Sequence, residues 1–137
     1  MAAEIFPRAL MAFAIAGVGI GLYGLTNHVV LKWASKKGYR GLGDFQYGIP
    51  AILYFTTPTC APCKTLQRPA IQALKNDLGS KLQIIEVDAS ARPELADYWG
   101  VLSVPTTFII DKKGEPLHIN HGVTLADKLR KQLNEVL

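Results

Sequence analysis

The most constraining feature of the sequence is a run of 23 residues, Ala9 to Leu31, that contains no charged side chain. A helix of this length rises about 35 Å, which is enough to cross a hydrocarbon core of about 30 Å. The run is too long for the apolar part of a signal peptide, only Arg8 stands in front of it as a basic residue, and no small-x-small cleavage site precedes Lys32. The sequence therefore predicts an uncleaved membrane anchor over residues 1–31, with its span at about 9–31.

The charges beside the span indicate its orientation. Only Arg8 precedes it, whereas four basic residues follow it closely: Lys32, Lys36, Lys37 and Arg40. Because basic residues are enriched on cytoplasmic flanks, the positive-inside rule places the C-terminal region in the cytoplasm. Small residues recur within the span, as at Gly17 and Gly21, and this spacing would let a second transmembrane helix approach closely.

Charge is distributed unevenly along the chain. The net charge of +4 belongs to residues 1–40, which carry five basic residues against Glu4, while residues 41–137 carry ten basic and ten acidic residues. A neutral region offers no basic face to a phosphate backbone, so we expect no nucleic-acid binding. With 137 residues and two cysteines, the chain has room for one compact domain beside the anchor and is not a disulfide scaffold.

Glycines and polar residues after the span predict a linker over residues 32–44, with the domain at 45–137. The apolar run 51–55, between Pro50 and Pro58, is typical of a strand buried on both faces of a sheet.

The pattern after this strand alternates between helix and strand. Residues 60–78 predict a helix in which Pro69 introduces a kink and apolar residues recur every four positions: Leu66, Ala70, Leu74 and Leu78. Residues 82–87 predict the next strand. Strand, helix and strand in this order indicate a parallel βαβ unit.

The last third of the chain predicts a short helix from Pro93 to Gly100 and an antiparallel hairpin of strands at 106–110 and 117–119. The pair Thr124 and Asp127 resembles a capping box at the start of a final helix. Four apolar residues of that segment are expected to face the sheet: Leu125, Leu129, Leu133 and Val136.

The two cysteines form a Cys60-Ala61-Pro62-Cys63 motif between the first predicted strand and its helix. A disulfide across two residues closes a loop too small to stabilise the fold much, so redox exchange explains the spacing better. At a helix start, backbone N–H groups and the helix dipole stabilise a thiolate. We therefore expect Cys60 to be the nucleophile and Cys63, one turn later, to resolve a mixed disulfide.

Zinc binding is the main alternative use of two cysteines at this spacing. A structural zinc site needs four ligands, and the other candidates, His118 and His121, lie 55 or more residues beyond Cys63. We therefore expect no metal site, with both histidines facing solvent or making local hydrogen bonds.

In order and spacing, the strand at 51–55, the cysteine motif, Val104-Pro105-Thr106 and Gly122 resemble the thioredoxin family. The resemblance covers residues 45–137 and implies an α/β thioredoxin-like fold with a cis peptide bond before Pro105. It also implies that protein substrates pair with the backbone of Val104 by strand addition. Five more residues would contribute to substrate binding: Thr59, Ala61, Pro62, Pro105 and Thr106.

Three departures from the family pattern stand out. Thr59 replaces the tryptophan that usually precedes the first cysteine, and Tyr54 stands where thioredoxins have a buried aspartate. With a pKa near 10, a tyrosine is a poor base at neutral pH. Residues 38–50 are too short and glycine-rich for the family's opening strand and helix, so we expect a thioredoxin-like fold trimmed at its N-terminus and preceded by one transmembrane helix.

These observations predict a membrane-anchored thiol-disulfide oxidoreductase that reduces protein disulfides without a cofactor. Its electrons would come from a separate reductase or a membrane electron donor. Two alternatives stay open. A non-catalytic docking subunit of a membrane complex agrees with the glycine-rich span, although the intact cysteine pair argues against it. An extracytoplasmic oxidant or isomerase would use the same residues in the opposite orientation.

Overall fold

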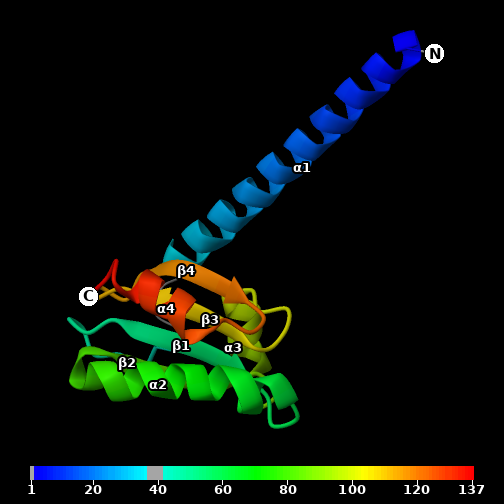
Figure 1. The fold of residues 1–137 in the computed structure, drawn as a ribbon. Helices are drawn as coiled ribbons and strands as arrows, with labels where there is room; N and C mark the ends of the chain where they lie inside the picture. Colours follow the sequence, from blue (N-terminus) through cyan, green and yellow to red (C-terminus); the bar gives the residue numbers. More distant parts are fainter. Residues whose placement is uncertain (1, 37–41) are drawn as a thin grey trace.

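A four-stranded mixed sheet organises the C-terminal region in the computed structural model, which describes residues 2–36 and 42–137 (Figure 1). The strand order is β2-β1-β3-β4. The elements follow one another as α1 (Ala2–Lys36), β1 (Ala51–Thr56), a π-helical turn (Cys63–Gln67), α2 (Arg68–Leu78), a 3₁₀ turn (Gly79–Lys81), β2 (Gln83–Asp88), α3 (Pro93–Trp99), β3 (Thr106–Ile110), β4 (Pro116–His121) and α4 (Ala126–Leu133).

Strand β1 lies at the centre of the sheet and is buried along its whole length. It pairs in parallel with β2, Leu53 opposite Ile85, which confirms the predicted parallel pairing of the strands on either side of the first domain helix. On its other side it pairs antiparallel with β3, Leu53 opposite Phe108. The predicted hairpin is also present, because β3 and β4 are antiparallel and the turn between them contains Gly114 at a φ of 86°.

Two hydrophobic clusters form the core, one on each face of the sheet. Side chains alternate along β1, so Leu53 and Phe55 lie in the cluster that includes Trp99 of α3. Ile52 and Tyr54 lie in the other cluster, which α2 and α4 cover. Figure 1 shows this arrangement, with α2 and α4 together on one face and α3 on the opposite face. The sheet therefore has the double-sided burial that the apolar run predicted.

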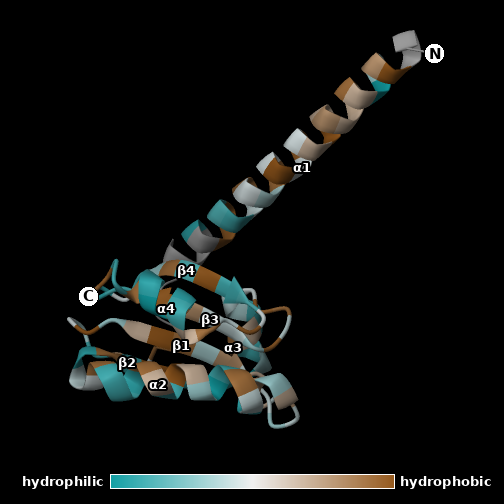
Figure 2. Cartoon of the chain, viewed as in Figure 1, coloured by the Kyte–Doolittle hydropathy of each residue, from teal (hydrophilic) through white to brown (hydrophobic). Residues whose placement is uncertain are grey.

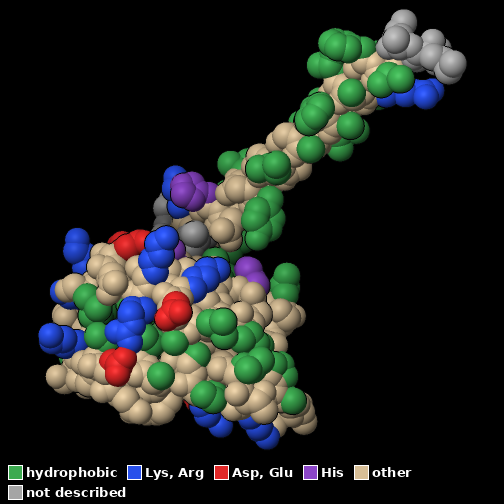
Figure 3. Space-filling model, viewed as in Figure 1, with side chains coloured by type: hydrophobic (Ala, Val, Ile, Leu, Met, Phe, Trp, Pro, Cys, Tyr) green, Lys and Arg blue, Asp and Glu red, His purple; other side chains and the backbone are tan. Residues whose placement is uncertain are grey.

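The long helix α1 is exposed along the span Ile5–Val30, which is long and apolar enough to cross a membrane. Figure 2 shows its mostly apolar surface, and Figure 3 shows hydrophobic side chains along it while charged ones gather on the domain. The helix meets the domain beside β4, with Val30 next to Gly100. It continues to Lys36, inside the segment expected to be a linker, and Lys37 and Arg40 lie outside the described residues.

The helix after β1 departs from regular α-helical geometry just before Pro69. A proline has no N–H and its ring collides with the carbonyl four residues earlier, which is why the sequence predicts a kink there. The chain forms a π-helical turn before the proline, in which the N–H of Arg68 bonds to the carbonyl of Cys63. The buried positions also differ from the predicted stripe, because Leu66 is 52% exposed while Gln67 is buried with Ile71.

The start of the last helix was also predicted wrongly. No side-chain capping bond is present, and Leu125 rather than Thr124 precedes the first helical turn. Leu125 is 64% exposed, whereas Leu129, Leu133 and Val136 are buried as expected. Thr124 is held elsewhere: its N–H donates to the side-chain oxygen of Gln67 over 2.8 Å.

Among the described residues, no strand or helix of the domain precedes β1, so the fold is trimmed as expected. Strand β2 consequently forms one edge of the sheet and β4 the other. Phe45 packs against the cluster that includes Trp99 and makes an edge-on contact with the ring of Tyr47. The short segment that contains Phe45 and Tyr47 thus stands where the family pattern has an opening strand and helix.

Replacing Phe108 by alanine should lower the free energy of unfolding by about 3–5 kcal/mol. The ring is fully buried and makes edge-on contacts with Trp99 and Phe55, at centroid distances of 5.0 and 6.0 Å. Urea unfolding of the detergent-solubilised chain, followed by near-UV circular dichroism, measures the change. Leu102→Ala is the control, since this side chain is 93% exposed and its loss should change stability by less than about 0.5 kcal/mol. Equal effects of the two substitutions would contradict the assigned core.

Candidate active site

The two cysteines form a disulfide at the point where β1 leads into the following helix. Their sulfur atoms are 2.04 Å apart, and the chain becomes helical at Ala61. The strand ends at Thr56, and a bond from the N–H of Cys60 to the carbonyl of Thr57 shapes the intervening turn. The rigid central strand therefore fixes the place of the pair, as expected for a functional turn on an α/β scaffold.

The two sulfurs lie in different environments. Cys60 is 8% exposed, whereas Cys63 is fully buried beneath the first turn of the helix. The backbone N–H of Cys63 donates to the Sγ atom of Cys60 over 3.3 Å. In the reduced protein, the same N–H group points at the atom where a thiolate charge would form, and such a bond favours the charged form.

Tyr54 lies directly below the helix that carries the cysteines. Its side chain is buried, and its hydroxyl donates to the backbone carbonyl of Cys63 over 3.3 Å. Burial raises the pKa of the Tyr54 hydroxyl above its ordinary value and outweighs the lowering by the side chain of Thr56. Glu86 raises this pKa and Arg68 lowers it by smaller amounts. The group below the buried cysteine is therefore a neutral hydrogen-bond donor and not a base.

The loop before β3 lies against the cysteines. The Val104–Pro105 peptide bond is cis, as the resemblance implied. The Val104 side chain packs against the cluster that contains both cysteines, and its backbone groups form no hydrogen bond with any residue in the described part of the chain. The carbonyl of Pro105 accepts from the N–H of Gly122, which ties this loop to the end of β4.

The residues expected to bind substrate fall into two groups. Thr59, Ala61 and Pro62 are exposed around the cysteine motif. Thr106 differs from the expectation, because it is fully buried and its hydroxyl donates to the carbonyl of Ser103 over 2.6 Å. A surface pocket of about 240 Å³ beside Val104 adds residues that the sequence did not single out, among them the exposed Leu102.

Gln67 is a site residue that the sequence analysis missed. It is fully buried, and its side-chain amide makes two bonds with the backbone of Thr124, donating to the carbonyl over 3.0 Å and accepting from the N–H over 2.8 Å. This pair of bonds fixes the loop before α4 onto the helix that holds the cysteines. The available signal was its position four residues after Cys63 and four before Ile71, on the buried side of the helix.

The two histidines considered as zinc ligands both lie on β4. The Nε2 atom of His118 lies 2.8 Å from a carboxylate oxygen of Glu135, and His121 is exposed at the end of β4. No cluster of three or more metal-binding side chains occurs among the residues described.

The thioredoxin family model matches residues 46–135. The thioredoxin of Bacillus subtilis is 32% identical over 83 residues, which cover 61% of this chain and 78% of the relative. A thioredoxin-like protein of Synechocystis is 28% identical over 73% of this chain and 95% of its own length. Among solved structures, Fasciola hepatica thioredoxin superposes with a TM-score of 0.59 at 23% identity, covering 66% of this chain and 84% of the other.

The family match spans more than half of the chain and includes every strand of the sheet. Thioredoxins exchange thiols and disulfides. This chain has the cysteine pair that such exchange requires, with the disulfide formed between the slightly exposed Cys60 and the buried Cys63. The chain therefore belongs to the thioredoxin family and is a thiol-disulfide oxidoreductase whose redox-active pair is Cys60 and Cys63.

Proposed function

We propose that this protein is a membrane-anchored reductase of protein disulfides, in which Cys60 attacks the substrate and Cys63 releases the reduced product. The observation that carries the proposal is the unequal accessibility of the two sulfurs. Only Cys60 reaches the surface, so only it can meet a sulfur atom of another protein. Cys63 is fully buried and lies within bonding distance of Cys60, as a resolving cysteine requires.

The proposed reaction has two exchange steps. The Cys60 thiolate attacks one sulfur of the substrate disulfide, a mixed disulfide forms, and the second substrate sulfur leaves as a thiolate that takes up a proton. Cys63 then loses its proton and attacks the Sγ atom of Cys60, which releases the first substrate sulfur. Two electrons pass to the substrate, and the Cys60–Cys63 disulfide remains. A dithiol of a separate reductase, or of a membrane electron donor, restores the reduced pair without a bound cofactor.

Substrate docking is assigned to the backbone of Val104, with Thr59, Ala61 and Pro62 as neighbouring contacts. The free N–H and C=O groups of Val104 support this assignment, because an extended chain can pair with them beside the cysteines. Backbone pairing tolerates many sequences, which suits a reductase with several protein substrates.

Anchoring is assigned to the span of α1. Its apolar side chains have no partner surface within the described chain, and a membrane would remove them from water. The basic residues after the span support a cytoplasmic domain in this proposal, by the positive-inside rule. We also propose that a second transmembrane helix packs against the glycines of the span, where small residues allow close approach.

The roles of the two cysteines predict different outcomes for Cys60→Ser and Cys63→Ser. The first variant should reduce insulin disulfides at the background rate, because no nucleophile reaches the surface. The second should attack substrate but fail to release it, so a covalent mixed disulfide accumulates. Non-reducing electrophoresis and mass spectrometry of the full chain detect that adduct.

Each serine variant is the control for the other, because both lose the disulfide and only one keeps the nucleophile. An adduct formed by Cys60→Ser but not by Cys63→Ser would reverse the assignment. If neither variant impairs the cell while the protein still assembles in the membrane, the alternative of a non-catalytic docking subunit is supported instead.

Tyr54→Phe should leave the pH dependence of mixed-disulfide resolution unchanged between about pH 6 and 9. The raised pKa of the Tyr54 hydroxyl keeps it neutral throughout this range, so its removal takes away no titrating group. The lost hydrogen bond to the Cys63 carbonyl should cost about 1 kcal/mol of stability. Stopped-flow kinetics over this pH range test the first statement, and an inflection that disappears in the variant would assign Tyr54 a part in proton transfer.

The reduction potential of the pair should lie near about −270 mV, as for thioredoxins in general. Equilibration of the full chain in detergent micelles against dithiothreitol and glutathione buffers, followed by alkylation of free thiols, gives the value. A potential above about −180 mV would support the oxidant or isomerase alternative and an extracytoplasmic domain. Labelling of reduced Cys60 in intact cells with a membrane-impermeant maleimide checks the orientation independently, and no labelling before permeabilisation is expected.

A further inference from the structure

The outer side of β2 presents unpaired backbone groups. The N–H groups of Gln83 and Ala89 donate to carbonyls of the β1 segment, at Pro50 and Thr56, over 3.0 and 2.8 Å. Alternate residues of a strand direct their N–H and C=O groups to opposite sides. Ile84 and Glu86 therefore direct both groups away from β1, and no other described strand pairs with them. We call this outer side, from Ile84 to Asp88, the β2 edge. At its end the carbonyl of Asp88 accepts from the N–H of Arg92 over 2.9 Å, so the groups open to a further strand are those of Ile84 and Glu86.

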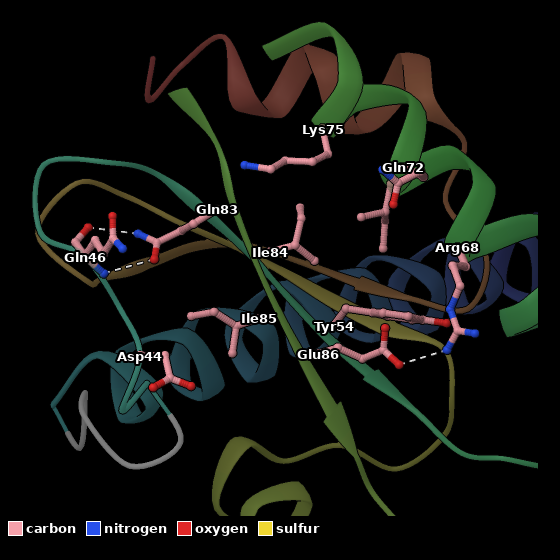
Figure 4. A pocket seen from close by; sticks show the side chains of 11 residues that line it. Asp44, Gln46, Tyr54, Arg68, Gln72, Lys75, Gln83, Ile84, Ile85 and Glu86 are labelled. Carbon is pink, nitrogen blue, oxygen red and sulfur yellow. Dashed lines mark hydrogen bonds and ion pairs between the residues drawn. The ribbon is translucent and has the colours of Figure 1, made fainter. Parts of the chain in front are cut away.

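A pocket flanks the β2 edge on each face of the sheet. The first, of about 430 Å³, lies between β2 and α2 and is lined by Ile71 and Ile84. Figure 4 shows its two ends, where Gln46 meets Gln83 and Arg68 meets Glu86. The second, of about 350 Å³, lies on the side of α3. An added strand projects its side chains alternately to the two faces, so it would place them in both pockets.

The β2 edge is acidic. Asp44, Glu86 and Asp88 line the pocket on the α3 side. The Glu86 carboxylate pairs with Arg68 on the α2 side, so Asp44 and Asp88 supply the unbalanced negative charge. The basic residue there, Arg92, is bound by Glu94, and on the other face the ammonium group of Lys75 donates to two backbone carbonyls. Hydrogen bonds from the hydroxyl and N–H of Ser90 lower the pKa of Asp88, which keeps this carboxylate charged. A partner segment with positively charged side chains would therefore complement the negative charge of this edge.

Among the described residues, helix α1 does not cover the β2 edge. This edge is the side of the sheet opposite β4, and α1 meets the domain beside β4 (Figure 1). A second copy of this chain is a poor occupant, because pairing two such edges would bring like charges together across the strands. The strand also contains neither the lysine nor the proline that commonly protect an exposed edge from pairing.

We propose that the β2 edge binds an extended segment of another protein, one that alternates apolar and basic side chains and adds a fifth strand beside Ile84 and Glu86. This site is separate from the cysteines, so a partner held there leaves Cys60 open to substrate. The proposal does not depend on the direction of the redox reaction.

The probe is an acetylated and amidated peptide that alternates valine and lysine, added to the full chain in detergent micelles. Hydrogen exchange of the Ile84 and Glu86 amides should slow by about tenfold on binding, because both N–H groups then donate to the peptide. A matched peptide with glutamate in place of lysine should give no protection. Protection elsewhere only, or equal protection by both peptides, would overturn the proposal.

The variant Glu86→Pro removes one outward N–H and should weaken peptide binding at least about tenfold, whereas Glu86→Gln loses the same charge and keeps the N–H. Because the lost N–H does not point to β1, the sheet should persist, and exchange of the β1 amides verifies this. Equal affinities of the two variants would contradict strand addition.

Protection of Ile84 that rises with protein concentration in the absence of peptide would indicate self-pairing and would also overturn the proposal. Insulin reduction, measured in parallel, reports separately on the thiol chemistry.

Discussion

Burial of β1 on both faces is the constraint on which the rest of the domain depends. Each residue of the strand belongs to one of two cores, so a slip of one position would exchange every side chain between them. That alternation places Ile52 under α2 and, two residues later, Tyr54 under the cysteine helix. The turn that follows then delivers Cys60 to the surface and Cys63 to the interior. The chemistry of the pair is thus set by the packing of the strand before it.

The sequence predicted the elements whose signals are local and apolar. The strand at 51–55, the parallel partner after it and the hairpin were all expected, because continuous apolar runs and turn residues specify them. The errors occur where a polar group is bound by a distant residue. The burial of Gln67 goes with two bonds between its amide and the backbone of Thr124, while the hydroxyl of Thr124 donates to the carbonyl of Gly122 instead of capping the helix. Two residues 57 positions apart cannot be paired from periodicity.

Thr106 illustrates the same limit at the active site. The residue after the cis proline was assigned to the substrate surface by resemblance, yet it begins β3 at a buried position and its hydroxyl satisfies the carbonyl of Ser103. It shapes the loop that presents Val104 and does not itself contact solvent. The departure at Tyr54 was visible in the sequence, but its partner was not, since the bond to the Cys63 carbonyl depends on the π-helical turn.

A tyrosine under the buried cysteine changes how the resolving step can lose its proton. A carboxylate accepts a proton at neutral pH, whereas the Tyr54 hydroxyl already donates to a backbone carbonyl and burial opposes its ionisation. In the proposed mechanism the proton of Cys63 therefore passes to an acceptor other than Tyr54, such as water or the departing substrate sulfur, on which negative charge develops as it leaves. Resolution then becomes sensitive to the leaving thiol, and substrates whose thiols have low pKa values leave faster. A domain with tyrosine in place of the buried carboxylate would therefore reduce some disulfides faster than others, according to the pKa of the substrate thiol that leaves.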